Sequence, residues 1–136
     1  MVKILFIGDG YPVGKGAGSI LYKRLLKSYG INNCCYYGIG YKTNLKWPEE
    51  FEKMPKQNSS LRIWPRGRIF KYFRKIPIIE ELYYFMLIPV ISKKIRRFAL
   101  INNVALIIAV FRADVLAIIN NFDKKHEFPI LGYISD

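Results

Sequence analysis

A cluster of alternating glycines near the start of the chain could hold a phosphate group. Gly14, Gly16 and Gly18 are separated by Lys15 and Ala17. Glycines let backbone N–H groups approach an anion closely, and a helix that begins after the loop adds the positive end of its dipole. Lys15 contributes a full positive charge. The sequence therefore predicts a phosphate-binding loop here, and the alternative is a plain flexible turn.

Two well-known phosphate-binding motifs do not fit this loop. A Walker A motif aligned on Gly14 and Lys15 requires glycine at position 9 and serine or threonine at position 16, where the chain has Asp9 and Gly16. The dinucleotide fingerprint G-x-G-x-x-G, aligned on Gly14 and Gly16, requires a third glycine where the chain has Ser19. It would also start about six residues after the first apolar run, whereas the fingerprint follows its strand closely. A nicotinamide-binding domain remains the less favoured alternative.

Other residues of catalytic or metal-binding type are few. The single histidine, His126, lies in a polar stretch typical of a surface connection. The adjacent Cys34 and Cys35 are expected to be buried reduced thiols, because neighbouring cysteines rarely bridge and metal sites need spaced ligands. The sequence therefore predicts no catalytic triad and no metal site, and it assigns no catalytic residue.

Apolar strands that alternate with amphipathic helices must position the loop. A short apolar run over residues 2–7 predicts a buried parallel strand, and Ser19 is expected to open a helix that ends at Gly30. Further strands are expected at 33–41, 61–64, 104–111 and 130–134, and further helices at 78–100, with Pro89 as a candidate break, and at 113–122. This order predicts an α/β fold: a parallel, Rossmann-like sheet with helices on both faces.

The predicted fold also indicates where a ligand would bind. In open parallel sheets, ligands bind beyond the carboxyl ends of the strands, at the point where the strand order reverses. Asp9 follows the first predicted strand, and Asp136 follows the last one. We therefore expect these two residues near one crevice, together with the glycine loop.

Length and composition limit the class of protein. The 136 residues, 51% of them hydrophobic and 24% charged, fit one globular domain and exclude a disordered chain. The longest apolar stretch, at 82–91, is shorter than the ~20 residues of a membrane-spanning helix, and the first apolar run is too short for a secretion signal. The sequence therefore predicts a cytoplasmic protein that is soluble or peripheral at the inner face of a membrane.

The net charge of +12 predicts an anionic partner, and much of it lies between residues 53 and 75. This part of an irregular segment expected at 43–75 has eight lysines and arginines, no acid and several aromatic residues. Such a composition suits an anionic membrane, single-stranded nucleic acid or a solvated face, and the membrane is favoured. The candidate surface residues are Trp64, Arg66, Arg68, Phe70, Lys71, Phe73, Arg74 and Lys75. A second basic cluster lies at 93–97.

The opening of the chain resembles a known family. An apolar strand, the residues Asp9-Gly10-Tyr11-Pro12, the glycine loop and a helix follow one another as in family 4 glycosyltransferases of the GT-B fold. The later strand at 104–111, the helix from Ala113 and the segment 128–136 also look like parts of that family's N-terminal domain. The resemblance covers nearly all of residues 1–136, but only the first of the family's two domains.

The resemblance implies transfer of a sugar from a nucleotide-diphosphate donor to the hydroxyl of a glycan or lipid-linked acceptor, in cell-surface polysaccharide or lipid-linked glycan synthesis. The other domain holds most of the donor, so the chain would be an incomplete domain, inactive alone, with no tightly bound cofactor. Gly16, Ala17 and Gly18 match the loop that meets the donor phosphates, although Ala17 departs from a double glycine. Asp136 matches the acid of a His-Asp or Arg-Asp pair, but Ser135 replaces the basic residue.

A second interpretation needs no catalysis. The chain would then be a basic α/β module that binds an anionic membrane or nucleic acid, with nucleic acid the less favoured partner.

Overall fold

The computed structural model describes residues 2–8, 17–39, 47–59, 72, 75–110, 113–122 and 127–133. In chain order, the described elements are β1 (Lys3–Gly8), α1 (Ala17–Tyr29), η1 (Ile31–Asn33), β2 (Cys34–Ile39), η2 (Glu49–Phe51), β3 (Lys56–Ser59), α3 (Pro77–Ile101), β4 (Val104–Val110), α4 (Ala113–Phe122) and β5 (Ile130–Tyr133). The two elements labelled η are short 3₁₀ turns. Apart from β3, the predicted strands and helices occur within a few residues of their expected ends.

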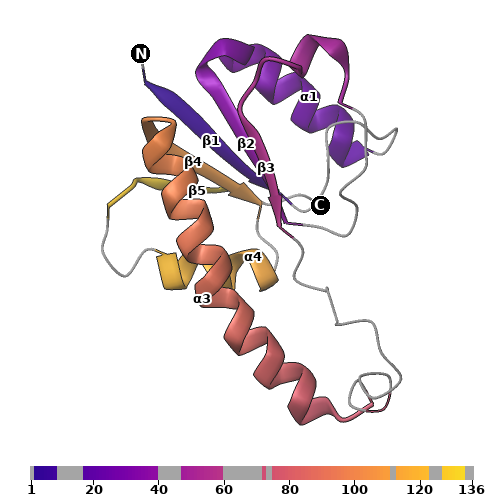
Figure 1. Ribbon diagram of the computed structural model, residues 1–136. Helices are drawn as coiled ribbons and strands as arrows, with labels where there is room; N and C mark the ends of the chain where they lie inside the picture. The colour runs from indigo at the N-terminus through magenta and orange to yellow at the C-terminus, as the bar shows by residue number, and fades with distance from the viewer. Residues whose placement is uncertain are drawn as a thin grey trace.

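The strands form one sheet in the order β3-β2-β1-β4-β5, and every neighbouring pair is parallel. The helix α1 lies on one side of this sheet, and α3 and α4 lie on the other (Figure 1). The predicted parallel α/β fold with helices on both faces is confirmed. Because the chain moves outward from β1 to β3 and then returns to β4, the strand order reverses between β1 and β4.

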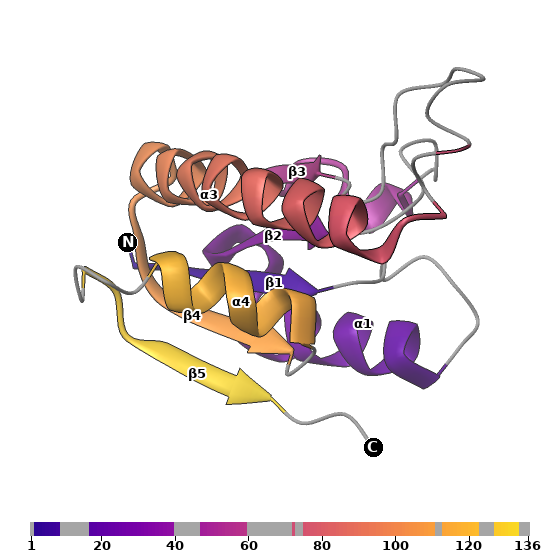
Figure 2. The same cartoon turned by 90° about the horizontal axis from the view of Figure 1, so that it is seen from below.

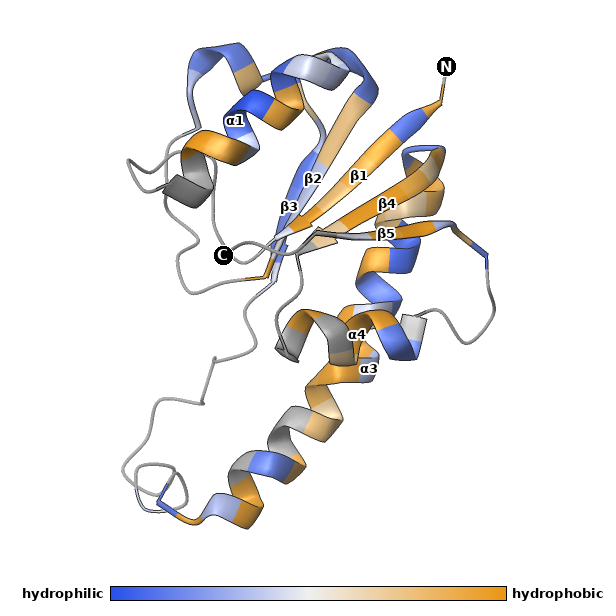
Figure 3. Cartoon of the chain, turned by 180° about the vertical axis from the view of Figure 1, so that it is seen from behind, coloured by the Kyte–Doolittle hydropathy of each residue, from blue (hydrophilic) through white to orange (hydrophobic). Residues whose placement is uncertain are grey.

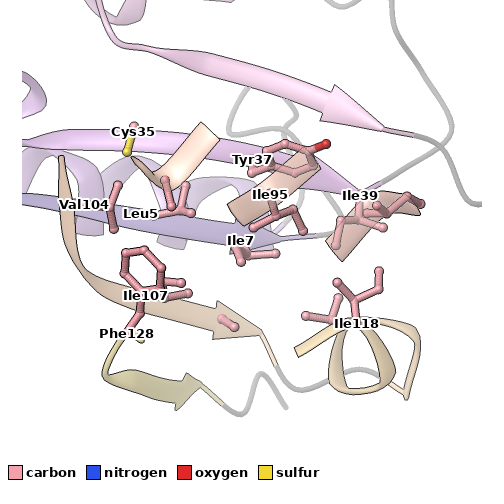
Figure 4. Packing of buried hydrophobic residues seen from close by; sticks show 14 residues of the cluster. Leu5, Ile7, Cys35, Tyr37, Ile39, Ile95, Val104, Ile107, Ile118 and Phe128 are labelled. Carbon is pink, nitrogen blue, oxygen red and sulfur yellow. The ribbon is translucent and has the colours of Figure 1, made fainter. Parts of the chain in front are cut away.

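The face under α3 and α4 holds the larger core. Leu5 and Ile7 of β1 point to this face, as the two-residue period of a strand requires. They pack with Ile95 of α3 and Ile118 of α4, all at most 1% exposed (Figure 4). Phe128, just before β5, adds an aromatic ring to the same cluster.

The opposite face packs against α1 and η2. Phe6 of β1 and Tyr36 of β2 are fully buried there, and Leu26 of α1 covers them. Phe51 of η2 closes this cluster from the side of β2, and its ring packs edge-on against Trp47 with centroids 6.3 Å apart. The turn η2 therefore covers part of this face beside α1.

A bulge at the start of β4 fits this strand to the core. Lys3 pairs with Val104, but the next residue, Ile4, pairs with Leu106, so Ala105 is an extra residue. A single extra residue reverses which side chains face which side of a sheet. As a result Val104 is buried under the same helix layer as Ile107, although three positions separate them.

The helix α3 runs through Pro89 without a break, so the expected interruption there is wrong. Proline removes one backbone donor, but Pro89 is exposed, and Leu87, Ile88 and Ile91 hold the helix against the core on both sides of it. With 25 residues, α3 is about 37 Å long, whereas the six residues of β1 span about 20 Å. Its N-terminal half therefore extends past the sheet (Figure 1).

The third strand lies elsewhere than predicted. The polar residues Lys56–Ser59 form β3, inside the segment expected to be irregular. The hydrophobic pattern misses this strand because β3 is at the edge of the sheet and buries only Ser59. The strand expected at 61–64 lies outside the described residues. The helix predicted to open at Ser19 begins two residues earlier, at Ala17.

Among the described helices, none has the length and apolar content that crossing a membrane requires.

Candidate functional site

The carboxyl ends of the strands form the candidate site. All five strands point the same way, so β1, which ends at Gly8, and β4, which ends at Val110, finish on the same side of the sheet (Figure 2). We call this side, where the strands have their C-terminal ends, the carboxyl edge. The helix α1 follows β1 and begins at Ala17, and α4 follows β4 and begins at Ala113. Two helix N-termini thus follow the two strands between which the strand order reverses. Their free N–H groups and dipoles favour an anionic group.

Gly8 is in close contact with two tyrosine hydroxyls. A β-carbon on Gly8 would lie 2.6 Å from Oη of Tyr22, on α1, and 2.9 Å from Oη of Tyr36, on β2. The two rings meet edge to face with centroids 5.9 Å apart, and both residues are buried. Only glycine allows the hydroxyls to reach this point at the end of β1.

Asn58 adds an amide group to this edge of the sheet. Gly8 pairs with Gly38, and Gly38 pairs with Asn58, so the three residues form one row across β1, β2 and β3. The side-chain atoms Oδ1 and Nδ2 of Asn58 are buried, and neither has a hydrogen-bond partner among the described residues. The row faces the same side of the sheet as Tyr36, so hydroxyl and amide groups converge where glycines leave out side chains.

A second polar contact joins β2 to β3 on the opposite face. The hydroxyl of Tyr37 lies 2.5 Å from Oγ of Ser59, and both residues are buried. Burial raises the pKa of Tyr37 above its ordinary value, and the hydrogen bond with Ser59 offsets part of that rise. Tyr37 is therefore a neutral hydroxyl that holds the edge strand in place.

The two cysteines are buried and unbridged, which confirms the expectation for them. Burial raises the pKa of Cys34 to about 11 and that of Cys35 to about 12. Cys34 Sγ contacts the carbonyl oxygen of Leu26 at 3.9 Å, and Cys35 Sγ contacts that of Ile4 at 3.6 Å. Because the thiolate is the reactive form, neither cysteine suits nucleophilic catalysis.

Most predicted site residues fall outside the described part of the chain. Ala17 and Gly18, which were predicted to lie in the loop, are the first residues of α1. Lys75 is exposed just before α3. The residues outside the described ranges are Asp9, Gly14, Lys15, Gly16, Trp64, Arg66, Arg68, Phe70, Lys71, Phe73, Arg74, His126 and Asp136.

Two polar residues in this part of the fold were not among the predicted site residues. Asn58 was missed because one asparagine in a short polar strand has no periodic signal. Asp114 lies in the first turn of α4, directly after β4. An acid in the first turn of a helix that follows a buried strand was a usable signal, because such a turn lies at the carboxyl edge of a parallel sheet.

A basic hollow lies apart from this edge, on the C-terminal half of α3. It measures about 320 Å³ and is lined by Lys93, Arg96, Arg97, Leu100 and Ile101. Arg96 donates two hydrogen bonds to the carboxylate of Glu127, at 2.6 and 2.7 Å. These bonds raise the pKa of Arg96 further.

Comparison with known proteins identifies no relative: no family model, no curated protein and no solved structure matches the chain. Within the described ranges, no three residues among histidine, cysteine, aspartate and glutamate are grouped to hold a metal ion. The described part of the site thus has two helix N-termini, whose free N–H groups favour an anion, beside buried hydroxyl and amide groups.

Proposed function

We propose that the chain is the acceptor-side, N-terminal half of a nucleotide-sugar-dependent glycosyltransferase. One observation carries the proposal: β1 and α1, the elements on either side of the glycine-rich residues in the sequence, lie where the strand order reverses, the usual ligand position in such sheets. The resemblance to family 4 glycosyltransferases begins with the same part of the sequence. The Rossmann-like fold by itself is shared by many activities.

The chemistry of the edge supports a nucleoside-diphosphate donor. The diphosphate would meet the backbone of Gly16, Ala17 and Gly18 and the N-terminus of α1, with Lys15 as a counter-charge. These groups bind and orient phosphate, and they need no tightly bound cofactor. The sugar and most of the donor would be held by a second domain.

The acceptor would bind on the side formed by this chain. The buried hydroxyls of Tyr22 and Tyr36 would shape the end of β1 behind this surface. We further propose that the acceptor is a glycan or is carried by a lipid at the cytoplasmic face of a membrane. Two clusters of basic residues, at 53–75 and at 93–97, support this proposal. Their positive charge favours a reaction at an anionic membrane surface.

An NMR titration of the isotopically labelled chain tests the donor assignment. UDP and GDP are each added and compared with uridine and guanosine, which lack the phosphates. We expect the diphosphates to shift the amide resonances of Gly8, Ala17 and Gly18, and the nucleosides to leave them unchanged. Lys15→Gln should weaken the effect, and Lys53→Gln, at an exposed lysine of the turn before β3, is the matched control.

The same preparation is assayed for turnover of UDP-glucose and GDP-mannose, and we expect negligible turnover. Robust turnover would show that the chain is not an incomplete half. Shifts at the edge caused by a nicotinamide dinucleotide, but not by UDP or GDP, would favour a dinucleotide-binding domain. Salt-dependent binding of vesicles or oligonucleotides without any response to diphosphates would favour a basic module without catalysis.

A further inference from the structure

The N-terminal half of α3 has an apolar surface that the fold leaves uncovered. Ile78, Leu82, Phe85, Met86 and Val90 are 47–72% exposed. We call these five residues the apolar overhang. They recur at intervals of three and four positions, so they lie along one side of the helix. In Figure 3, hydrophobic segments (orange) alternate with hydrophilic ones (blue) in this half of α3.

The exposure of the overhang follows from the length of α3. The helix is about 37 Å long, and the sheet covers only its C-terminal part, where Ile91, Ile95 and Ala99 are buried. Because the C-terminal end of α3 leads into the start of β4, its N-terminal part lies toward the carboxyl ends of the strands (Figure 1). The overhang therefore projects from the edge that carries the candidate site (Figure 1).

Positive charge follows the overhang on the same helix. Lys93, Lys94, Arg96 and Arg97, here called the basic turn, come within two turns of Val90. No described acid forms an ion pair with Lys93, Lys94 or Arg97, whereas Arg96 pairs with Glu127. The hollow of about 320 Å³ lies between the basic turn and two exposed apolar residues, Leu100 and Ile101.

We propose that this side of α3 docks on an anionic lipid bilayer. The overhang would enter the boundary between headgroups and acyl chains, and the basic turn would contact lipid phosphates. An exposed apolar helix face with adjacent lysines and arginines is the pattern of an interfacial helix. Charge complementarity selects a lipid surface over a second copy of this chain, because two basic turns brought together would repel each other.

This inference deepens the proposed function: it rests on the membrane-carried acceptor proposed there and names the surface that would contact the bilayer. It adds an orientation: α3 would lie along the bilayer surface, and the carboxyl edge of the sheet, with the candidate site, would lie beside the overhang at that surface. A lipid-linked acceptor could then reach the site without leaving the membrane.

Co-sedimentation with vesicles tests the docking. We expect the chain to bind vesicles of equal parts phosphatidylcholine and phosphatidylglycerol, to bind pure phosphatidylcholine much less, and to dissociate at high salt. Phe85→Ser combined with Met86→Ser should weaken partitioning roughly tenfold or more. Lys93→Gln and Lys94→Gln should each weaken it about fivefold. Leu131→Ser and Arg24→Gln, at exposed positions of β5 and α1, are the matched controls.

A fluorescent label locates the contact. Because Cys34 and Cys35 are buried with raised pKa values, a cysteine introduced by Phe85→Cys would take up a thiol-reactive, polarity-sensitive dye selectively. We expect anionic vesicles to shift the dye emission to the blue. Leu131→Cys, labelled in the same way, should show no shift.

Three outcomes would overturn the proposal. One is vesicle binding that the overhang and basic-turn variants leave unchanged. Another is a dye at position 85 whose emission does not shift to the blue although the protein is bound to the vesicles. The third is a dimer in solution that Leu82→Glu dissociates, in a chain that binds no vesicles, because the surface would then serve a second copy. A nucleoside-diphosphate titration of the same variants tests the donor site separately, since the overhang is not part of it.

Discussion

The hydroxyl of Tyr22 occupies the space that a side chain on Gly8 would need. The oxygen lies 2.6 Å from the position of a β-carbon on Gly8, well inside van der Waals contact. This relationship joins the end of β1 to α1 at the candidate site. It makes Gly8 a position where even the smallest side chain has a cost.

Gly8→Ala should therefore destabilise the chain. The new methyl group would press on the tips of Tyr22 and Tyr36, and overpacking of this kind costs about 1–3 kcal/mol. Thermal unfolding followed by circular dichroism measures the loss. Tyr22→Phe in the same chain should recover part of it, and Gly132→Ala, on exposed β5, should change the free energy of unfolding by less than about 0.5 kcal/mol. An unchanged melting temperature for Gly8→Ala would contradict the packing described here.

Tyr37→Phe should weaken the attachment of the edge strand. The substitution leaves Oγ of Ser59 buried without its hydrogen-bond partner, which costs about 1–3 kcal/mol. Adding Ser59→Ala removes the unpaired group, so the double variant should be more stable than Tyr37→Phe alone. Urea denaturation of the four proteins gives the coupling energy. Strictly additive effects would show that the two hydroxyls do not interact.

Pro89→Ala should stabilise the chain. Proline inside a helix lacks the N–H group that would donate to the carbonyl of Phe85, and it costs up to about 3 kcal/mol relative to alanine. Pro89 is exposed, so the substitution removes no core packing. Thermal melting should show a higher midpoint, whereas Val90→Ala, the exposed neighbour, should have little effect. A lower midpoint for Pro89→Ala would mean that α3 needs the proline.

The stability of the chain should fall at alkaline pH because of the cysteines. Cys34 and Cys35 have folded-state pKa values of about 11 and about 12, against 9.0 without burial. Below pH 9.0 the thiols are protonated in both the folded and the unfolded state, so their burial makes its full contribution to the free energy of unfolding. Above that pH the unfolded state loses the thiol protons first, so the free energy of unfolding falls by about 1.4 kcal/mol per pH unit for each cysteine. The loss ends when the folded thiols titrate.

Urea denaturation between pH 8 and pH 10.5 measures this slope. The variant with Cys34→Ala and Cys35→Ala should show a shallower decline than the unsubstituted chain. At neutral pH, a thiol reagent should modify the native protein slowly and the urea-unfolded protein at once. Fast modification of the native chain would contradict the burial of the two thiols.

Local patterns were enough to predict most of the fold. The apolar runs that became β1 and β4 and the amphipathic period of α1 are properties of neighbouring residues, and they placed these elements within a few positions. The alternation of strands and helices was enough to predict a parallel sheet, because parallel neighbours need a crossover between them. The burial of the adjacent cysteines also followed from their type and spacing.

The candidate site was predicted only in part. The order of elements predicted the edge of the sheet at which β1 ends and α1 begins, whereas the ligand-binding loop predicted from the glycines stays a prediction, because Gly14, Lys15 and Gly16 lie outside the described residues. Asn58 was not predicted as a site residue because the polar segment Lys56–Ser59 forms a strand only through its pairing with β2, which is distant in the sequence. No local property of Lys56–Ser59 expresses that pairing.

The sequence by itself determined the class of fold, the positions of β1, α1 and β4 and the excess of positive charge. Composition and short-range periodicity suffice for these properties. Only the tertiary structure showed that Tyr22 contacts Gly8 and that a bulge at Ala105 places Val104 in the core. It also showed that α3 extends beyond the end of the sheet (Figure 1). These features depend on which distant residues are packed together and on the length of one element relative to another. For the same reason an apolar overhang could be recognised only after the sheet had shown which part of α3 it leaves uncovered.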